Sequence, residues 1–285
     1  MIKIICFTLC ICSSVIGMSQ VTLIADGPGN TYELITEALA PGYKPIEAPG
    51  IQKGDCDNHV NFKEHISEIF DKELNKNVFK FVIHTNEDND RCKNFDRQRN
   101  EIKVYRSSPD SLKATKGETV EYRWKFKLDK NFKPSKNFTH IHQLKSVDEK
   151  PKAKPMITLT ARKGSTDYLE LRYSSGKNQQ TLTKVSLDTF RGRWVEVVET
   201  VTYDVVGKAS YAIYITDVED DHTILEYKDD SLGFWQNEAS FARPKWGIYR
   251  SLKNKQDLRD EELFFADFMI TEKIRNASEK DTVKY

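Results

Sequence analysis

The chain has 285 residues, and its 44 lysines and arginines nearly balance its 43 aspartates and glutamates, for a formal net charge of +1. That balance lacks the basic excess of a nucleic-acid-binding protein, and no recognised nucleic-acid module is present. Basic residues do cluster at 91–106 and 243–250, so an anion site would have to be local. The length allows one large β domain or two small domains, because an all-β sandwich commonly uses about 200–250 residues.

The first 19 residues have the pattern of a secretory signal peptide. Lys3 precedes an apolar stretch that runs from Ile4 to about Ile16, and Gly17-Met18-Ser19 places small residues at the usual cleavage offsets. The stretch is too short for a stop-transfer helix. We therefore expect residues 1–19 to be removed and residues 20–285 to form a single secreted domain, extracellular or periplasmic, with no remaining membrane anchor.

Two cysteines remain in the expected mature chain, Cys56 and Cys92. In an exported protein such a pair most simply forms one disulfide, which we expect here as a structural bridge. A metal site would need more ligands than the pair offers, even with a nearby histidine such as His59 or His84. We therefore expect no metal ligands. The other three cysteines leave with the signal peptide: Cys6, Cys10 and Cys12.

The acidic string Asn86-Glu87-Asp88-Asn89-Asp90 offers hard oxygen ligands of the kind that calcium prefers. It lacks the spacing and the glycine of an EF-hand loop, so a polar turn before Cys92 is the favoured interpretation. We expect that no cofactor is required, and a structural calcium ion is the alternative that we do not favour.

Alternation with a period of two dominates the rest of the chain. Residues Glu121–Leu128 alternate charge with apolar bulk, which predicts a strand with one wet face and one core face. Similar runs, separated by glycine turns, are Tyr168–Tyr173, Arg193–Tyr203, Ala209–Ile215 and Leu263–Glu272. One helix is expected near Phe62 to Leu74. This pattern predicts an all-β, two-sheet antiparallel jelly roll (a concanavalin-like sandwich) with one short helix near the N-terminus and a concave sheet as a groove.

Three segments far apart in the chain carry charged or phenolic groups at alternating positions. They are Arg99-Asn100-Glu101-Ile102-Lys103, Gln143-Leu144-Lys145 and Lys245-Trp246-Gly247-Ile248-Tyr249. Alternate side chains of a strand share one face. If the three strands lie in one sheet, a single surface collects cations, an amide and a phenol. Such a set suits the removal of a proton next to a carboxylate.

The order and parity of these segments resemble the family 7 alginate lyases, which are jelly rolls with an Arg-x-Glu-Leu-Arg strand, a Gln-Ile-His strand and a Tyr-Phe-Lys-Ala-Gly-x-Tyr strand. Lys145 stands where those enzymes have histidine. The pair of Lys145 and Tyr249 on this architecture resembles the pair found in polysaccharide lyase family 28, the ulvan lyases. The sequences at 96–103 and 138–145 also resemble those of that family. The resemblance covers about residues 25 to 272. It implies an endo-acting lyase that cleaves a uronic-acid polysaccharide, most simply ulvan, with glucuronan or alginate as alternatives.

The chemistry of such a lyase assigns roles to four residues. Beta-elimination removes the C5 proton of a uronate and expels the glycosidic oxygen from C4, leaving an unsaturated uronyl end. Arg99 and Gln143 are expected to neutralise the substrate carboxylate. Lys145 is the expected base, provided that desolvation or nearby cations lower its pKa. Tyr249 is the expected acid, although it could serve as both base and acid.

Four further residues are candidates for substrate binding: Arg97, Glu101, Lys103 and Lys245. Arg97 shares the parity of Arg99 and would bind a sulfate or carboxylate of the substrate, unless it is a surface residue. Glu101 is favoured as a partner of Arg99 or Lys103 that fixes their rotamers. Lys103 and Lys245 are as well explained as solvated strand residues.

Two histidines precede Gln143 in the same predicted strand. His140 and His142 have the opposite parity to Gln143, so we expect both to point toward the core as hydrogen-bonded histidines. A β-bulge would reverse this expectation.

Two other classes of function compete with a lyase. A glycoside hydrolase needs two carboxylates on one face, and Glu196 and Glu199 differ in parity. A noncatalytic carbohydrate-binding protein would keep the groove without the converging lysine and tyrosine. The expected partner is an anionic polysaccharide, with no nucleic acid, no membrane after signal cleavage, and a monomeric state.

Overall fold

The computed structural model describes residues 20–51, 64–148, 154–236 and 238–273. The expected signal peptide and Cys56 lie outside these ranges, so the cleavage and the pairing of Cys56 with Cys92 stay predictions. Within the described part of the chain, no helix is long and apolar enough to cross a bilayer.

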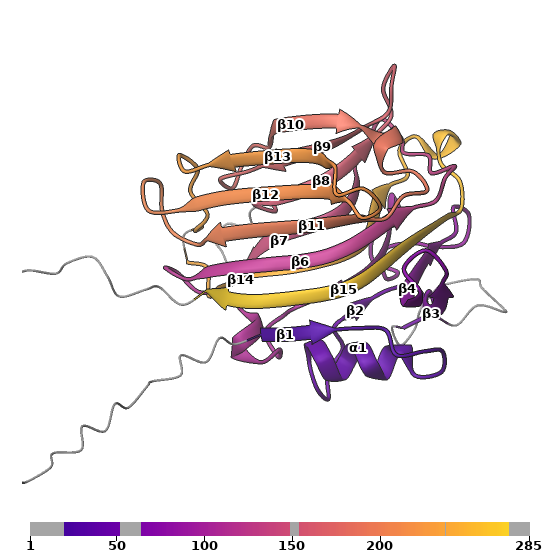
Figure 1. Ribbon diagram of the computed structural model, residues 1–285, viewed down its shortest axis with the longest axis horizontal. Helices are drawn as coiled ribbons and strands as arrows, with labels where there is room; N and C mark the ends of the chain where they lie inside the picture. Colours follow the sequence, from indigo (N-terminus) through magenta and orange to yellow (C-terminus); the bar gives the residue numbers. More distant parts are fainter. Residues whose placement is uncertain (1–19, 52–63, 149–153, 237, 274–285) are drawn as a thin grey trace, which may run out of the picture.

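Two antiparallel sheets pack face to face, as Figure 1 shows. The first sheet has the order β13-β12-β11-β6-β15-β4-β3, with β1 also paired to β15. Its strands are β1 Gln20–Leu23, β3 Ile66–Asp71, β4 Lys76–Ile83, β6 Thr119–Leu128, β11 Val195–Thr202, β12 Ser210–Asp217, β13 Thr223–Asp229 and β15 Glu261–Lys273. The second sheet has the order β10-β9-β8-β7-β14-β5-β2. Its strands are β2 Ile46–Glu47, β5 Arg97–Lys103, β7 Thr139–Val147, β8 Ile157–Arg162, β9 Tyr168–Tyr173, β10 Gln180–Ser186 and β14 Phe241–Ser251.

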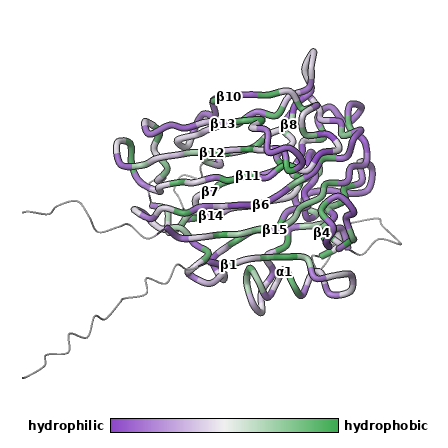
Figure 2. Tube along the Cα trace, in the orientation of Figure 1, coloured by the Kyte–Doolittle hydropathy of each residue, from purple (hydrophilic) through white to green (hydrophobic). Residues whose placement is uncertain are grey.

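The core lies between the two sheets and follows the predicted alternation. In β6, Tyr122, Trp124 and Phe126 are fully buried while the residues between them are half-buried. Figure 2 shows hydrophobic segments recurring along the strands, β15 among them. Burial of such large side chains stabilises the sandwich by about 1.5–3 kcal/mol for each. The all-β, two-sheet fold is therefore confirmed, and the predicted strands correspond to β6, β9, β11, β12 and β15.

The helix is not where the sequence pattern placed it. The α-helix α1 spans Thr31–Leu39, with Thr31, Ile35 and Leu39 buried at the spacing of one helix face. Within the expected helix near Phe62 to Leu74, the described residues instead form β3 and the turn that joins it to β4. Asn75 in that turn adopts a left-handed conformation (φ 52°). The backbone groups of β3 pair with the strand that follows at once, and this tertiary pairing outweighs the helix-like spacing of the apolar residues. Three 3₁₀ turns complete the described elements: η1 Asp110–Leu112, η2 Leu187–Thr189 and η3 Lys255–Asp257.

Candidate active site

The three motif segments lie on adjacent strands of the second sheet. Strand β14 pairs with β5 on one side and with β7 on the other (Figure 1). Tyr249 therefore lies opposite both Arg99 and His140, and Lys245 lies opposite both Lys103 and Gln143. This arrangement confirms the expectation that the three segments share one sheet.

A pocket of about 580 Å³ lies over these strands, on the sheet face turned away from the core. It brings together all four predicted catalytic residues, with Arg97 and Lys245 beside them. Its lining residues are Glu47, Arg91, Arg97, Arg99, Phe138, His140, Gln143, Lys145, Lys154, Pro155, Gln179, Arg243, Lys245 and Tyr249. Glu101 and Lys103 do not line it. Among the described residues that line it, cationic side chains predominate over the one carboxylate, that of Glu47, so the pocket suits an anionic ligand.

Glycine at position 247 lets β14 and β5 approach closely beneath the pocket. Gly247 lies opposite Glu101 and has a left-handed backbone (φ 137°). A Cβ atom there would lie 2.1 Å from the backbone oxygen of Asn100 and 2.8 Å from the Cα atom of Glu101. Backbone atoms cannot yield to such a contact, so this position requires glycine.

Glu101 is the buried anion that organises the floor of the pocket. Its carboxylate accepts hydrogen bonds from Arg99, from the amide of Gln143, and from Lys245 at 2.6 Å. Burial acts to raise the pKa of Glu101, but Lys245 and Arg99 outweigh it and hold this pKa below its ordinary value. Glu101 thus pairs with Arg99, as expected, and acts by positioning its neighbours.

Glu47, at the end of the short strand β2, is a second buried anion. It accepts from Lys245 at 2.6 Å, Lys103 at 2.6 Å and Arg91 at 2.7 Å. Burial again opposes ionisation, yet these cations together with Arg99 hold the pKa of Glu47 well below its ordinary value.

The two lysines that contact Glu47 are not solvated strand residues. Lys245 is 4% exposed, and burial with the nearby charge of Arg99 lowers its pKa. Burial lowers the pKa of Lys103 to about 8 against the attraction of Glu47. Lys103 is not among the residues that line the pocket, and its amine donates to Glu47 beside it.

Arg99 is anchored by three carboxylates. Its Nε and Nη2 donate to Asp90 at 2.9 and 3.3 Å, and its Nη1 donates to Glu101 and, at 3.5 Å, to Glu47. These bonds take four of the five N–H groups of the guanidinium. Burial acts to lower the pKa of Arg99, but the carboxylates outweigh it and raise it. Arg99 is therefore fixed as a cation in one orientation.

Two guanidinium groups hold Tyr249 in place. The carbon of the Arg99 guanidinium lies 3.6 Å from the centroid of the tyrosine ring, a close cation–π contact. Nη1 of Arg97 donates to the Tyr249 hydroxyl oxygen at 3.0 Å. The hydroxyl oxygen accepts this bond, and its O–H group is still able to donate to another group.

The prediction for His140 was wrong, because β7 contains a bulge. The pairing of β7 with β8 shifts between His140 and His142, so that Ile141 and His142 both face the core and His140 faces the pocket. His140 Nδ1 lies 2.8 Å from Thr160 Oγ1. Burial, reinforced by nearby arginines, lowers the pKa of His140 to about 3, so its imidazole is neutral at neutral pH.

His142 does point into the core, as predicted. Its Nε2 lies 2.8 Å from the carboxylate of Glu199 on β11, across the sandwich. Glu196 lies on the other face of β11, where its carboxylate accepts a hydrogen bond from Arg123 at 3.0 Å. The two glutamates therefore cannot form the paired carboxylates of a glycoside hydrolase.

Sequence reasoning missed several residues that build the pocket, chiefly Glu47, Asp90, Arg91 and Arg243. Arg91 and Arg243 were visible only as members of the two basic clusters. Asp90 belongs to the acidic string, and its carboxylate contacts Arg91 and Arg99, which makes it part of the pocket's support. Glu47 lies in a two-residue strand with no pattern of its own, so no sequence signal could have found it.

Comparison with known proteins identifies the family. The family described as polysaccharide lyase matches residues 68–268, most of the chain. This chain belongs to the polysaccharide lyase family. It is therefore an enzyme of polysaccharide breakdown, which decides against the noncatalytic and glycoside hydrolase alternatives. No curated protein sequence matches the chain.

Solved structures support the jelly-roll fold of this lyase at low sequence identity. The endo-β-1,4-glucuronan lyase of the fungus Trichoderma reesei is 14% identical with a TM-score of 0.52, over 79% of this chain and 93% of that one. The PL-14 alginate lyase of Aplysia kurodai is 14% identical with a TM-score of 0.55, over 87% and 97%. Alginate lyase Aly36B is 9% identical with a TM-score of 0.56, over 90% and 98%.

Replacement of Glu101 by glutamine is expected to destabilise the fold by about 3 kcal/mol. The change removes one charge from a buried cluster and leaves Arg99 and Lys245 undercompensated. Urea unfolding of the two proteins measures the difference. The matched control is Glu262→Gln, whose ion pair with Lys80 at 3.2 Å lies at the surface and is worth about 1 kcal/mol or less. Equal effects of the two substitutions would contradict the organising role of Glu101.

Proposed function

We propose that this polysaccharide lyase cleaves a uronic-acid-containing chain internally by β-elimination, with ulvan as its substrate. The observation that carries the proposal is the pocket over β5, β14 and β7, where Arg99, Gln143, Lys145 and Tyr249 meet among cationic side chains. A uronate presents a carboxylate to such a surface. Two of the structurally similar proteins are described as lyases of alginate and of glucuronan, which supports the uronate class.

The substrate carboxylate is assigned to the amide of Gln143 and to Arg99. Gln143 gives one N–H to Glu101 and has a second for the substrate. Arg99 likewise keeps one N–H group after its bonds to the three carboxylates. Both groups are fixed before the ligand arrives, so they stabilise the charge that builds up on the carboxylate without reorganisation.

Lys145 is assigned as the base that takes the C5 proton. It is half-buried in the pocket lining and lies opposite Arg243 across the strand pair. Its amine is therefore placed where a ligand in the pocket can reach it. His140 also faces the pocket, but a pKa of about 3 makes its imidazole a weak proton acceptor at neutral pH. Its neutral ring is better suited to a hydrogen bond with the sugar.

Tyr249 is assigned as the acid that protonates the leaving glycosidic oxygen. Arg97 and Arg99 fix the phenol in the pocket as described. Proton donation in the transition state contributes about 10²–10⁴-fold to such reactions. The resemblance of the lysine and tyrosine pair to the ulvan lyases is what favours ulvan over glucuronan and alginate.

A panel of uronate polymers tests the proposal. The full-length protein is incubated with ulvan, glucuronan, alginate and a glycosaminoglycan, while ultraviolet absorbance and reducing ends are followed together. We expect absorbance from unsaturated uronyl products with ulvan, and a rapid fall in viscosity because cleavage is internal. Absorbance with a different polymer alone would overturn the assignment to ulvan, and absorbance with none of them would overturn the uronate class.

Secretion forms part of the same proposal, because a lyase of a high-molecular-weight polysaccharide meets its substrate outside the cell. Expression of the full chain, followed by N-terminal sequencing of the protein in the medium, tests it. A new N-terminus at Gln20 is expected, and retention of Met1 in the cell fraction would contradict it.

A further inference from the structure

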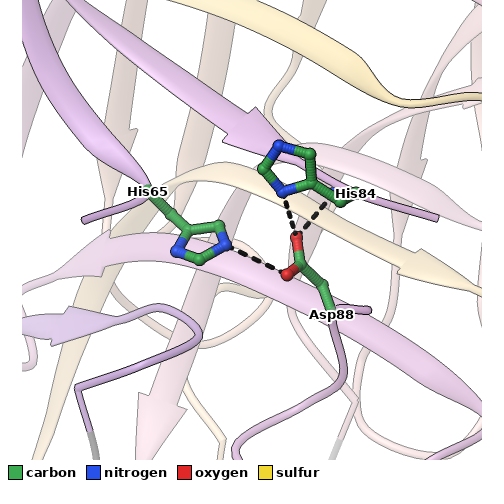
Figure 3. A group of neighbouring side chains, drawn as sticks. All are labelled: His65, His84 and Asp88. Carbon is green, nitrogen blue, oxygen red and sulfur yellow. Dashed lines mark hydrogen bonds and ion pairs between the residues drawn. The ribbon is translucent and has the colours of Figure 1, made fainter. Parts of the chain in front are cut away.

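Two histidines and an aspartate converge on one point (Figure 3), and none of the three is among the residues that line the pocket. His65 immediately precedes β3, His84 immediately follows β4, and Asp88 lies in the loop beyond. Nε2 of His65 lies 3.0 Å from one carboxylate oxygen of Asp88, and Nδ1 of His84 lies 3.3 Å from the other. All three ligand atoms lie within 4.8 Å of one another.

These separations suit a tetrahedral zinc ion. Zinc binds imidazole nitrogen and carboxylate oxygen at about 2.0–2.2 Å, which places neighbouring ligand atoms a little over 3 Å apart. Each histidine lies at about that separation from one oxygen of Asp88, His65 from Oδ1 and His84 from Oδ2, and the three ligand atoms lie within 4.8 Å of one another. Two imidazoles and one carboxylate form a donor set that zinc commonly takes, with one position open. Calcium and magnesium prefer oxygen ligands, so a site with two histidine nitrogens does not favour either ion.

The three side chains are largely buried, and hydrogen bonds from neighbouring residues hold their backbones in place. The side chains of His65 and Asp88 are fully buried, and that of His84 is 21% exposed, which leaves one opening to solvent. Two amides of β5 hold the backbones of the ligands. Gln98 donates to the carbonyl oxygens of His84 at 2.7 Å and Asp88 at 2.9 Å, and Asn100 donates to that of His65 at 2.8 Å. The ligands are thus pre-positioned by surrounding groups, as in metal sites.

We propose that His65, His84 and Asp88 bind a zinc ion as three protein ligands, with the fourth position open to solvent. The ion joins the β3–β4 hairpin to the loop that follows it. Two residues beyond Asp88 that loop carries Asp90, the bidentate partner of Arg99. Zinc therefore stabilises the support of the pocket without contacting the polysaccharide. The sequence analysis expected no metal, because the cysteine pair offered too few ligands and the acidic string that contains Asp88 lacks the spacing of an EF-hand; only the fold brings His65 to His84 and Asp88.

The test measures zinc binding and thermal stability of the full-length protein, neither of which requires a substrate. The protein is stripped with a chelator, dialysed, and titrated with zinc chloride, with zinc content determined by mass spectrometry. We expect about one zinc per chain and a higher Tm with zinc than without. His84→Gln is the principal variant, because His84 is the least buried ligand. Loss of a residue that only supports a ligand lowers metal affinity by about 10–100-fold. Because His84 is itself a ligand, we expect a larger fall in zinc affinity for this variant, and we expect its Tm no longer to rise with zinc.

The matched control is His222→Gln, since His222 is an exposed histidine in the loop between β12 and β13. It should bind zinc as the unmodified protein does. If His84→Gln does not fold, Asp88→Asn is used as the test variant instead, because asparagine has the same shape as the aspartate ligand. A protein that takes up no zinc, or a ligand variant that binds zinc as tightly as the control, overturns the site. Both readouts are independent of the lyase assay, so failure of the proposed substrate leaves this result unaffected.

Discussion

Replacement of Tyr249 by phenylalanine is expected to lower the turnover of the preferred uronate polymer by about 10²–10⁴-fold, the usual contribution of a general acid. The ring should stay in place, because its contact with the guanidinium of Arg99 at 3.6 Å does not involve the hydroxyl. Only the proton donor to the leaving oxygen is lost. Initial rates of ultraviolet absorbance measure the effect, and urea unfolding shows whether the fold is unchanged.

The control for this substitution is Tyr214→Phe. Tyr214 is a half-buried tyrosine on β12, in the sheet that does not carry the pocket. Its loss of a hydroxyl should leave the rate within about twofold of the original, since it touches no pocket residue and surface substitutions have small effects. A Tyr249→Phe protein that retains the full rate would remove the tyrosine from the mechanism and leave proton donation to another group.

Replacement of Lys145 by methionine is expected to lower kcat by about 10²–10⁴-fold with a smaller change in KM, because a base acts mainly in the transition state. Methionine keeps the length and the apolar stem of lysine and removes the amine. The matched control is Lys154→Met, which removes an exposed lysine from the lining of the same pocket. That control should raise KM several-fold and leave kcat nearly unchanged.

The comparison separates chemistry from electrostatic attraction. Equal losses in both lysine variants, confined to KM, would show that Lys145 only attracts the polyanion. In that event Tyr249 is the next candidate for the base, since one tyrosine could serve as both base and acid. The ring of His140, which lies across the strand pair, contacts that of Tyr249 with centroids 5.9 Å apart.

Much of the fold was predictable from the sequence, because alternation of burial in a strand follows directly from the direction of its side chains. Strand β6 and strand β9 lie where the alternation placed them. The helix was misplaced because apolar spacing near residues 62–74 resembles one helix face, whereas β3 finds its backbone partners in β4. Pairing between strands is a tertiary property that no local pattern encodes.

The candidate site was predictable in part for the same reason. Parity alone grouped Arg99 with Glu101 and Gln143 with Lys145, and the common sheet then brought these groups into one surface. Parity failed at His140, because a single bulge residue in β7 turns every residue before it to the other face. Bulges leave no signature in a polar and apolar pattern, so this error could not have been avoided.

The sequence by itself determined the class of fold, the class of enzyme as a polysaccharide lyase, and the four candidate catalytic side chains that the pocket brings together. Those properties depend on local alternation and on short motifs, which a chain carries in its order of residues. Only the tertiary structure decided that Glu47 and Asp90 neutralise the buried cations, that two arginines orient Tyr249, and that His65 meets Asp88. Such contacts depend on how the chain folds. A buried charge is stable only where folding brings an opposite charge next to it, and no local sequence pattern shows where that happens.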